Sequence, residues 1–271
     1  MRPPVTDRRS TPAQHLVRAL WPPVVFGVGL VLVWELAVWG FDFQPYFLPA
    51  PTKVGEAFTS NLNLIREAAS VSGANALAGL LFGTAAGVLV SFALMRFSVL
   101  NDMVSPLAIA VNAVPIVVLV SVFNNQFAST SEVPRRLMVT LIVYFVVLVN
   151  VAKGLRDVES THLELMRSYA ASPLEVIRKL RVPNAIAYLF TALKIAAPLA
   201  VITAFVAEYF GGTQNGLGYR ITSNLATSKN AVAWAYVAGA CLLGLVFYVI
   251  ATVVESLINQ QRGASPKGET S

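Results

Sequence analysis

The chain has 271 residues, of which 56% are hydrophobic and only 13% are charged. A soluble protein of this length needs more charge to cover its surface, so the composition excludes a soluble globular domain and indicates a membrane protein with several spans. The net charge of +6 follows the positive-inside rule rather than indicating a nucleic-acid partner. The single cysteine, Cys241, excludes a disulfide within the chain and a cysteine-based metal site, and we expect it to be a small core residue.

The N-terminal tail, residues 1–18, is polar and rich in Pro and Arg, and is expected to be disordered or to lie on the membrane surface. The apolar run after it is too long for the hydrophobic region of a signal peptide, so it is interpreted as a retained first span. A span needs roughly 20 mostly apolar residues. Six stretches qualify: about Ala19–Trp39, Asn75–Leu94, Pro106–Phe123, Leu137–Val151, Ile186–Val206 and Ala233–Leu257. The predicted fold class is an all-α polytopic membrane protein with six transmembrane helices, a membrane domain over residues 19–257 and a C-terminal tail over residues 258–271.

The segments between the spans carry three further signals. Prolines in Leu48-Pro49-Ala50-Pro51 favour an extended turn, after which Thr52 is expected to cap a short interfacial helix from Lys53 to about Asn61. Spans two and five are rich in glycine and alanine, which let helices approach closely in lipid, so both are expected to be buried in the bundle. The glycine-dense segment Gly211–Tyr219 lacks the Lys and Ser/Thr of a P-loop and is not expected to bind phosphate.

No combination of residues indicates catalysis. The two histidines, His15 and His162, are far apart in the chain, and no Ser/His/Asp set, HExxH motif or Cys/His cluster is present. The chain is therefore expected not to be an enzyme and to bind no cofactor or metal itself. Ionisable residues within spans mark a path, a pair or a cavity. Those in or near the spans are Glu35, Lys194, Glu208 and Glu255. Lys194 is expected to snorkel and Glu255 to reach water. For Glu35, Lys194 and Glu208, a structural pair or anchor and a substrate contact both stay open.

Between about residues 153 and 183 the apolar character stops and charges of both signs appear. The excess of Lys and Arg places this segment and both termini in the cytoplasm. The basic residues on that side are Arg2, Arg8, Arg9, Arg18, Arg96, Lys153, Arg156, Arg167, Arg178, Lys179, Arg181, Arg262 and Lys267, against Lys53, Arg66, Arg135, Arg136, Arg220 and Lys229 on the other. Such a structured insert is typical of a segment presented to a soluble partner; the alternative is a surface loop that only closes the bundle.

Two capping boxes predict a helix–turn–helix in this insert. Thr161 with Glu164 starts the first helix, which should end near residue 170, and Ser172 with Glu175 starts the second, with a proline at its first position. The second helix should run toward residue 182, where Pro183 ends or kinks it. The i, i+3, i+4 spacing predicts one apolar face. Its members are Met166, Tyr169, Ala170, Pro173, Ile177 and Leu180.

The insert resembles the EAA loop of permease subunits in bacterial binding-protein-dependent ABC importers. That pattern reads E-A-A, three residues, Gly, about nine residues, Ile/Val, one residue and Leu-Pro. Glu164 matches its Glu, Pro183 matches its Pro, and Ala170 stands where its Gly does, while Leu165-Met166 replace the Ala pair. Alanine suits a position that needs close packing and is a poor substitute if a positive φ is needed.

Motifs outside the insert resemble the members of this family that import sulfonates, taurine, nitrate and thiamin-pyrimidine precursors. They are Leu48-Pro49-Ala50-Pro51, Ala113-Val114-Pro115-Ile116, Gly154-Leu155-Arg156 and Val206-Ala207-Glu208 with Gly216-Leu217-Gly218. The resemblance covers about residues 48–257.

The resemblance implies a multi-pass permease subunit of the bacterial cytoplasmic (inner) membrane. Its partners would be a second permease chain, identical or related, two ABC ATPase subunits and an extracytoplasmic solute-binding protein, with ATP acting through the ATPases. The implied ATPase-coupling residues are Glu164, Met166, Arg167, Tyr169, Ala170, Ala171, Ser172, Pro173, Ile177 and Pro183. Candidate pore-lining residues, which could equally be interfacial span-end residues, are Asn112, Pro115, Asn124, Asn125, Gln126 and Glu208. The alternative function is a self-contained channel or an ion-coupled secondary transporter, which would be expected to show intramembrane charged sites and often inverted repeats.

Overall fold

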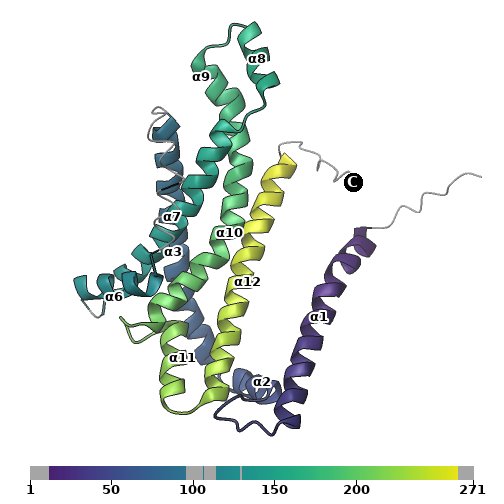
Figure 1. Ribbon diagram of the computed structural model, residues 1–271, viewed down its shortest axis with the longest axis vertical. Helices are drawn as coiled ribbons and strands as arrows, with labels where there is room; N and C mark the ends of the chain where they lie inside the picture. The colour runs from purple at the N-terminus through teal and green to yellow at the C-terminus, as the bar shows by residue number, and fades with distance from the viewer. Residues whose placement is uncertain (1–11, 96–105, 107–113, 129, 262–271) are drawn as a thin grey trace, which may run out of the picture.

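The structure, a computed structural model, describes residues 12–95, 106, 114–128 and 130–261. Four long apolar helices run side by side in it (Figure 1). They are α3 (Leu62–Met95), α7 (Val133–Arg156), α10 (Val182–Tyr209) and α12 (Asn230–Gln261). In the described part of the chain, these four are the helices long and apolar enough to cross a membrane, α10 together with the helical turns that precede it.

Small residues bring the central helices together. The α3–α7 contact is a ladder of Gly79, Gly83 and Gly87 against Val139, Val143 and Val147. A Cβ atom added at Gly79 would lie 2.3 Å from the Cβ of Val139, so only glycine allows this backbone approach. Every fourth residue of α10 from Ala192 to Ala204 is an alanine that is 0% exposed and belongs to the same core. The prediction that spans two and five are buried in the bundle is confirmed only for their small-residue faces, because Leu81 and Phe82 of α3 are 61% and 65% exposed.

The predicted third span, Pro106–Phe123, is not one continuous helix. Val114 and Pro115 are non-helical, and α6 (Ile116–Gln126) begins only after them. Proline lacks the N–H that a helix interior needs and disfavours a helical conformation in the residue before it, which explains the break. Helix α6 packs on α7 through Val120 and Met138 and then projects sideways from the bundle (Figure 1).

Helix α1 (Pro12–Gly40) stands apart from the four long helices and reaches the rest of the chain through α2 (Pro51–Ser60) (Figure 1). The rings of Trp34 and Trp234, 5.1 Å apart, join its far end to α12. The apolar side chains of α1 are otherwise largely exposed, as Phe26 is at 74%.

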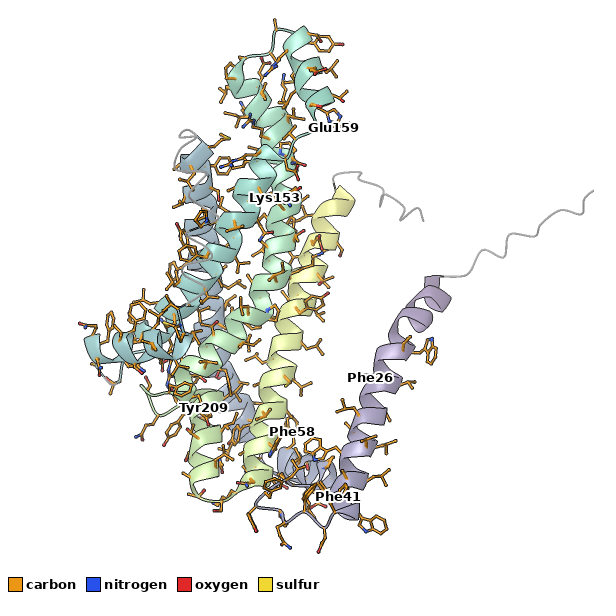
Figure 2. All side chains as sticks on the ribbon, viewed as in Figure 1. Phe26, Phe41, Phe58, Lys153, Glu159 and Tyr209 are labelled. Carbon is orange, nitrogen blue, oxygen red and sulfur yellow. The ribbon has the colours of Figure 1, made fainter. Side chains whose placement is uncertain are left out.

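The two ends of the bundle differ. At the hairpin end, α8 (Ser160–Ser168) and α9 (Pro173–Val176) extend beyond the long helices (Figure 1). At the α11 end lie the short helices α2 and α11 (Gly216–Ala226). Figure 2 shows Lys153 and Glu159 at the base of the hairpin, and Phe41 and Phe58 at the other end.

Of the two outcomes predicted at Pro183, an end or a kink, the end does not occur, and the chain passes from the hairpin into α10. A π-helical turn, η1 (Ile177–Arg181), joins α9 to α10. In this wider turn the N–H of Val182 donates to the carbonyl of Ile177, five residues back. Pro183 then falls in the first turn of α10, where its missing N–H disturbs little.

Candidate functional site

The first helix of the hairpin starts one residue before its predicted cap. Helix α8 begins at Ser160, and its N-cap, Glu159, makes no side-chain capping bond. The carbonyl of Glu159 accepts from the N–H groups of His162 at 3.1 Å and Leu163 at 3.3 Å. The predicted capping box of Thr161 with Glu164 is therefore wrong, because Thr161 already lies within the first helical turn.

The turn between the hairpin helices depends on Ala170, whose φ is +50°. The N–H of Ala171 donates to the carbonyl of Met166 at 3.0 Å, and that of Ala170 to the carbonyl of Arg167 at 2.9 Å. This is a Schellman C-cap, in which the left-handed position is usually glycine. The family's glycine position thus does require a positive φ here, and alanine occupies it at a cost of about 1–2 kcal/mol.

The second capping box is confirmed. The N–H of Glu175 donates to Ser172 Oγ at 3.4 Å, and the N–H of Ser172 donates to Glu175 Oε2 at 3.0 Å. Pro173 occupies the first helical position, as predicted. An ion pair of 2.9 Å between Lys179 and Glu175 joins α9 to the π-helical turn.

The hairpin's apolar residues divide between two faces. Leu165, Tyr169 and Leu174 project outward and are 52%, 77% and 63% exposed; we call these three residues the apolar tip. Leu163 and Ile177 instead line a groove against the end of α3. The single predicted face is wrong in part, because the left-handed turn reorients the second helix. Of its members, Tyr169, Ala170 and Pro173 are exposed, and Met166, Ile177 and Leu180 are half-buried. Of the other predicted coupling residues, Glu164, Arg167, Ser172 and Pro183 are exposed and Ala171 is half-buried.

The base of the hairpin is joined to both neighbouring long helices. The side-chain amide of Asn184 donates to the carbonyls of Gly154 at 2.8 Å and Asp157 at 2.9 Å. The hydroxyl of Tyr188 donates to the carboxylate of Asp157. A Cβ added at Gly154 would lie 2.7 Å from the Cβ of Tyr188, so the end of α7 lies directly against α10. We call these four residues the hinge clamp; apart from the Gly154 motif, sequence reasoning missed them.

At the α11 end, Glu208 caps α11 from another helix. Its side chain is 1% exposed, and its Oε2 accepts from Ser72 Oγ at 2.7 Å and from the N–H of Gly218 at 3.1 Å. Ser72 Oγ in turn accepts from the N–H of Leu217 at 2.9 Å. Because α11 has no side-chain cap of its own, these bonds satisfy its first N–H groups. This buried position favours the anchoring role of Glu208 over pore lining.

Glu35 caps the N-terminus of α2 from another helix, as Glu208 caps α11. The N–H of Thr52 donates to Glu35 Oε2 at 3.1 Å, and its hydroxyl donates to Oε1 at 3.0 Å. The prediction that Thr52 caps a helix starting at Lys53 is wrong, because Pro51 fits the first helical position and the helix begins there. Each of these two carboxylates thus anchors one short helix.

A buried arginine holds the loop before α11. Arg135 is 1% exposed, and its guanidinium donates to Glu132 at 2.9 Å, to Asn215 and to the carbonyl of Thr213. Asn215 and Asn75 also donate to Glu132, each at 2.8 Å. Burial acts to raise the pKa of Glu132, but the Asn215 hydrogen bond and the charge of Arg135 outweigh it, so this pKa lies below its ordinary value. We call these five residues the buried polar network.

The remaining candidate pore-lining residues do not share one environment. The side chain of Asn124 is half-buried against Gly211 and Gly212, whereas Pro115 is exposed at the start of α6. Asn125 and Gln126 are exposed at the end of α6. Asn112 lies outside the described residues.

Lys194 and Glu255 form an ion pair of 2.8 Å between α10 and α12. This favours the structural-pair interpretation of Lys194, since pairing lowers the cost of charge near lipid. The expectation that Cys241 is a core residue is wrong, because Cys241 is exposed on α12 in the described part of the chain. Within the described ranges, no group of three or more His, Cys, Asp or Glu residues could hold a metal ion.

The comparisons with known proteins agree with this arrangement. Residues 79–261 match the family described as "Binding-protein-dependent transport system inner membrane component". The chain is 30% identical over 208 residues to a probable ABC transporter permease protein of Haemophilus influenzae, covering 75% of this chain and 82% of that protein. It is 26% identical over 245 residues to the formylaminopyrimidine transport permease protein ThiX of Halalkalibacterium halodurans, covering 87% and 94%.

Among solved structures, the fold is similar to a chain of the MetNI methionine ABC transporter in an inward-facing conformation, with a TM-score of 0.52 over 71% of this chain and 95% of that one. At 19% identity this likeness shows the fold alone. The family match spans more than half of the chain, and the relatives are transport permease components rather than enzymes. The chain therefore belongs to the family of binding-protein-dependent transport system inner membrane components, as its motifs predicted.

Proposed function

We propose that the chain is the permease subunit of an ATP-driven importer, in which the hairpin receives an ATPase subunit and passes its movement to the spans. The excess of Lys and Arg at the hairpin end supports a cytoplasmic position for that end. In this proposal both termini lie on that side, and the six spans are the four long helices, helix α1 and the predicted span Pro106–Phe123.

The apolar tip carries this proposal. Three large apolar side chains, each more than half exposed, stand on a hairpin that extends beyond the long helices (Figure 1). Exposed apolar clusters of this kind mark protein–protein contacts, in which aromatic residues are enriched. Tyr169 would enter a groove of the ATPase. Leu165 and Leu174 join Tyr169 in this contact, whereas the predicted coupling residues Arg167, Ala171, Pro173 and Ile177 line the groove beside α3.

The hinge clamp supplies the second half of the mechanism. A force on the tip reaches α7 through the Asn184 bonds to Gly154 and Asp157, and reaches α10 directly because the hairpin continues into it. Interfaces that are packed this tightly move as units. ATP-driven closure of two ATPases would thereby tilt α7 and α10 and open the pore to either side in turn, without this chain binding ATP itself.

The solute is proposed to be small: a sulfonate, nitrate, taurine or a pyrimidine-like compound. The name of the ThiX relative supports the pyrimidine option. A solute-binding protein would deliver it to the α11 end, and a second permease chain would complete the pore. Thermal-shift screening of the partner binding protein against small anions and pyrimidines would identify the solute.

The docking claim is tested by placing charge on the apolar tip. The double variant Leu165→Asp/Tyr169→Asp should purify as an intact permease that no longer retains its ATPase and no longer supports uptake. The matched control Tyr46→Asp/Leu225→Asp changes two exposed apolar residues at the α11 end and should retain the ATPase. Retention by both variants would show that the ATPase binds elsewhere, and uptake without any ATPase would establish the channel or carrier alternative.

Sidedness needs a separate experiment. In a Cys241→Ser background, a cysteine introduced by Tyr169→Cys should react with a membrane-impermeant maleimide only after the cells are opened. Labelling from outside intact cells would reverse the orientation.

A further inference from the structure

A groove of about 600 Å³ lies between the hairpin and the end of α3. Its lining includes apolar Phe92, Met95, Leu163 and Ile177 and basic Arg167 and Arg181. The apolar residues from α3 belong to its last two turns, where that helix ends at the hairpin end of the bundle. The arginines come from α8 and from the π-helical turn. The groove therefore joins an apolar wall, continuous with a membrane-spanning helix, to two positive charges.

The two arginines have no acidic partner within the described ranges. Among the described residues that line the groove, none carries a carboxylate. Of the hairpin's acids, Glu159 lies 3.4 Å from His162, Glu175 pairs with Lys179, and Glu164 is exposed and is not among the residues that line the groove. The positive charge of Arg167 and Arg181 is thus available to an anionic ligand.

We propose that this groove binds one anionic phospholipid of the leaflet on the hairpin side. The phosphate lies between Arg167 and Arg181, and an acyl chain follows Phe92 and Met95 along α3. Basic pockets beside the ends of spans are suited to anionic lipid headgroups, and arginine holds phosphate through several N–H donors. A free phosphate would leave the apolar wall unused, and a neutral lipid would leave the arginines unpaired.

The lipid and the ATPase would use different residues of the hairpin. None of the apolar-tip residues Leu165, Tyr169 and Leu174 lines the groove, so both partners fit at once. A lipid held against Arg167 and Ile177 would fill the space between the hairpin and α3. The lipid site goes beyond the proposed import function and does not depend on the ATPase.

Native mass spectrometry of the full-length chain in neutral detergent tests this site. Phosphatidylglycerol should bind more tightly than phosphatidylcholine with the same acyl chains. The variant Arg167→Gln/Arg181→Gln should weaken phosphatidylglycerol binding by about tenfold or more. The matched control Lys153→Gln/Arg178→Gln removes the same charge from the same end, outside the groove lining, and should leave the affinity unchanged. Millimolar inorganic phosphate should not displace the lipid.

Three results would overturn the proposal: equal affinity for the two lipids, equal loss in the two double variants, or displacement by inorganic phosphate. A second measurement needs no charge removal and so does not depend on the folding of a variant. A phosphatidylglycerol with a photoreactive acyl chain should label the peptide that contains Phe92 and Met95 in the wild-type chain. Labelling confined to other helices, or co-purification of a peptide in the groove, would contradict the site.

Discussion

The hairpin end and the α11 end hold their short helices in opposite ways. At the α11 end two of the anchoring groups, Glu208 and Arg135, are each 1% exposed, and both bond to partners distant in sequence. At the hairpin end the bonds are local and exposed, and the apolar tip faces outward. The difference indicates that the α11 end is stabilised from within, whereas the hairpin end leaves its surface free for a partner and is fixed only at its base.

Breaking the buried polar network should have the largest effect on stability. Arg135→Met removes a buried charge and leaves Glu132 without its cation, so we expect a loss of about 3 kcal/mol in unfolding free energy. Thermal unfolding in detergent measures it. The control Arg136→Met changes the exposed neighbour, whose side chain makes one hydrogen bond of 3.1 Å to Asn75, and should lose less than about 1 kcal/mol. Equal losses would mean that burial does not distinguish the two arginines.

Loosening the hinge clamp should affect function more than assembly. Asn184→Leu keeps the side-chain size but leaves the carbonyls of Gly154 and Asp157 without their donor, at a cost of about 1–3 kcal/mol. We expect the ATPase to stay bound while the uptake rate falls by about tenfold. The control Thr191→Val on the same helix removes a bond made only to Ala187 of that helix and should retain uptake. Loss of ATPase binding in Asn184→Leu would show that the clamp shapes the docking surface itself.

Replacing Ala170, the left-handed residue of the turn, with glycine should make the hairpin more ordered. Ala170→Gly removes the steric cost of φ +50° and should stabilise the hairpin by about 1 kcal/mol or less, after the greater freedom of glycine in the unfolded chain is deducted. Hydrogen exchange of the α8 amides should slow. Ala170→Val should accelerate exchange, because a β-branched residue tolerates this region poorly. Faster exchange in the Ala170→Gly variant would show that Ala170 is not strained in the wild-type turn.

The smallest expected effect is a pH dependence at the α11 end. The folded pKa of Glu132 lies below its ordinary value of 4.5. Its stabilisation is therefore fully present above about pH 4.5 and is lost as the pH falls through the folded pKa. The stability difference between the wild type and Glu132→Gln should shrink as the pH is lowered from about 7 to about 3. The control variant Glu56→Gln changes an exposed residue paired with Lys53, and its stability difference from the wild type should change less with pH. If the two variants gave the same pH dependence, Glu132 would not belong to the buried polar network.

Whether the sequence could predict a feature depends on how far apart along the chain its interacting residues lie. The Ser172 capping box is local, so its residue types and spacing predicted it, and the small-residue spans predicted their own burial. The caps supplied by Glu35 and Glu208 join residues 17 and 136 positions apart, and the Asn184 clamp spans 30 positions to Gly154. No local pattern contains such pairs. The break at Pro115 was visible in the sequence, but the apolar composition of the run outweighed it.

The central claim is that the apolar tip docks the ATPase while the α11 end faces the other way. Tyr169 and Tyr46 offer a matched test, because they are 77% and 70% exposed and lie at opposite ends. Each is replaced by photoreactive benzoylphenylalanine, and membranes containing the whole transporter are irradiated. The account predicts that position 169 crosslinks to the ATPase subunit and position 46 does not. A crosslink to the ATPase from position 46, or none from position 169, would contradict it.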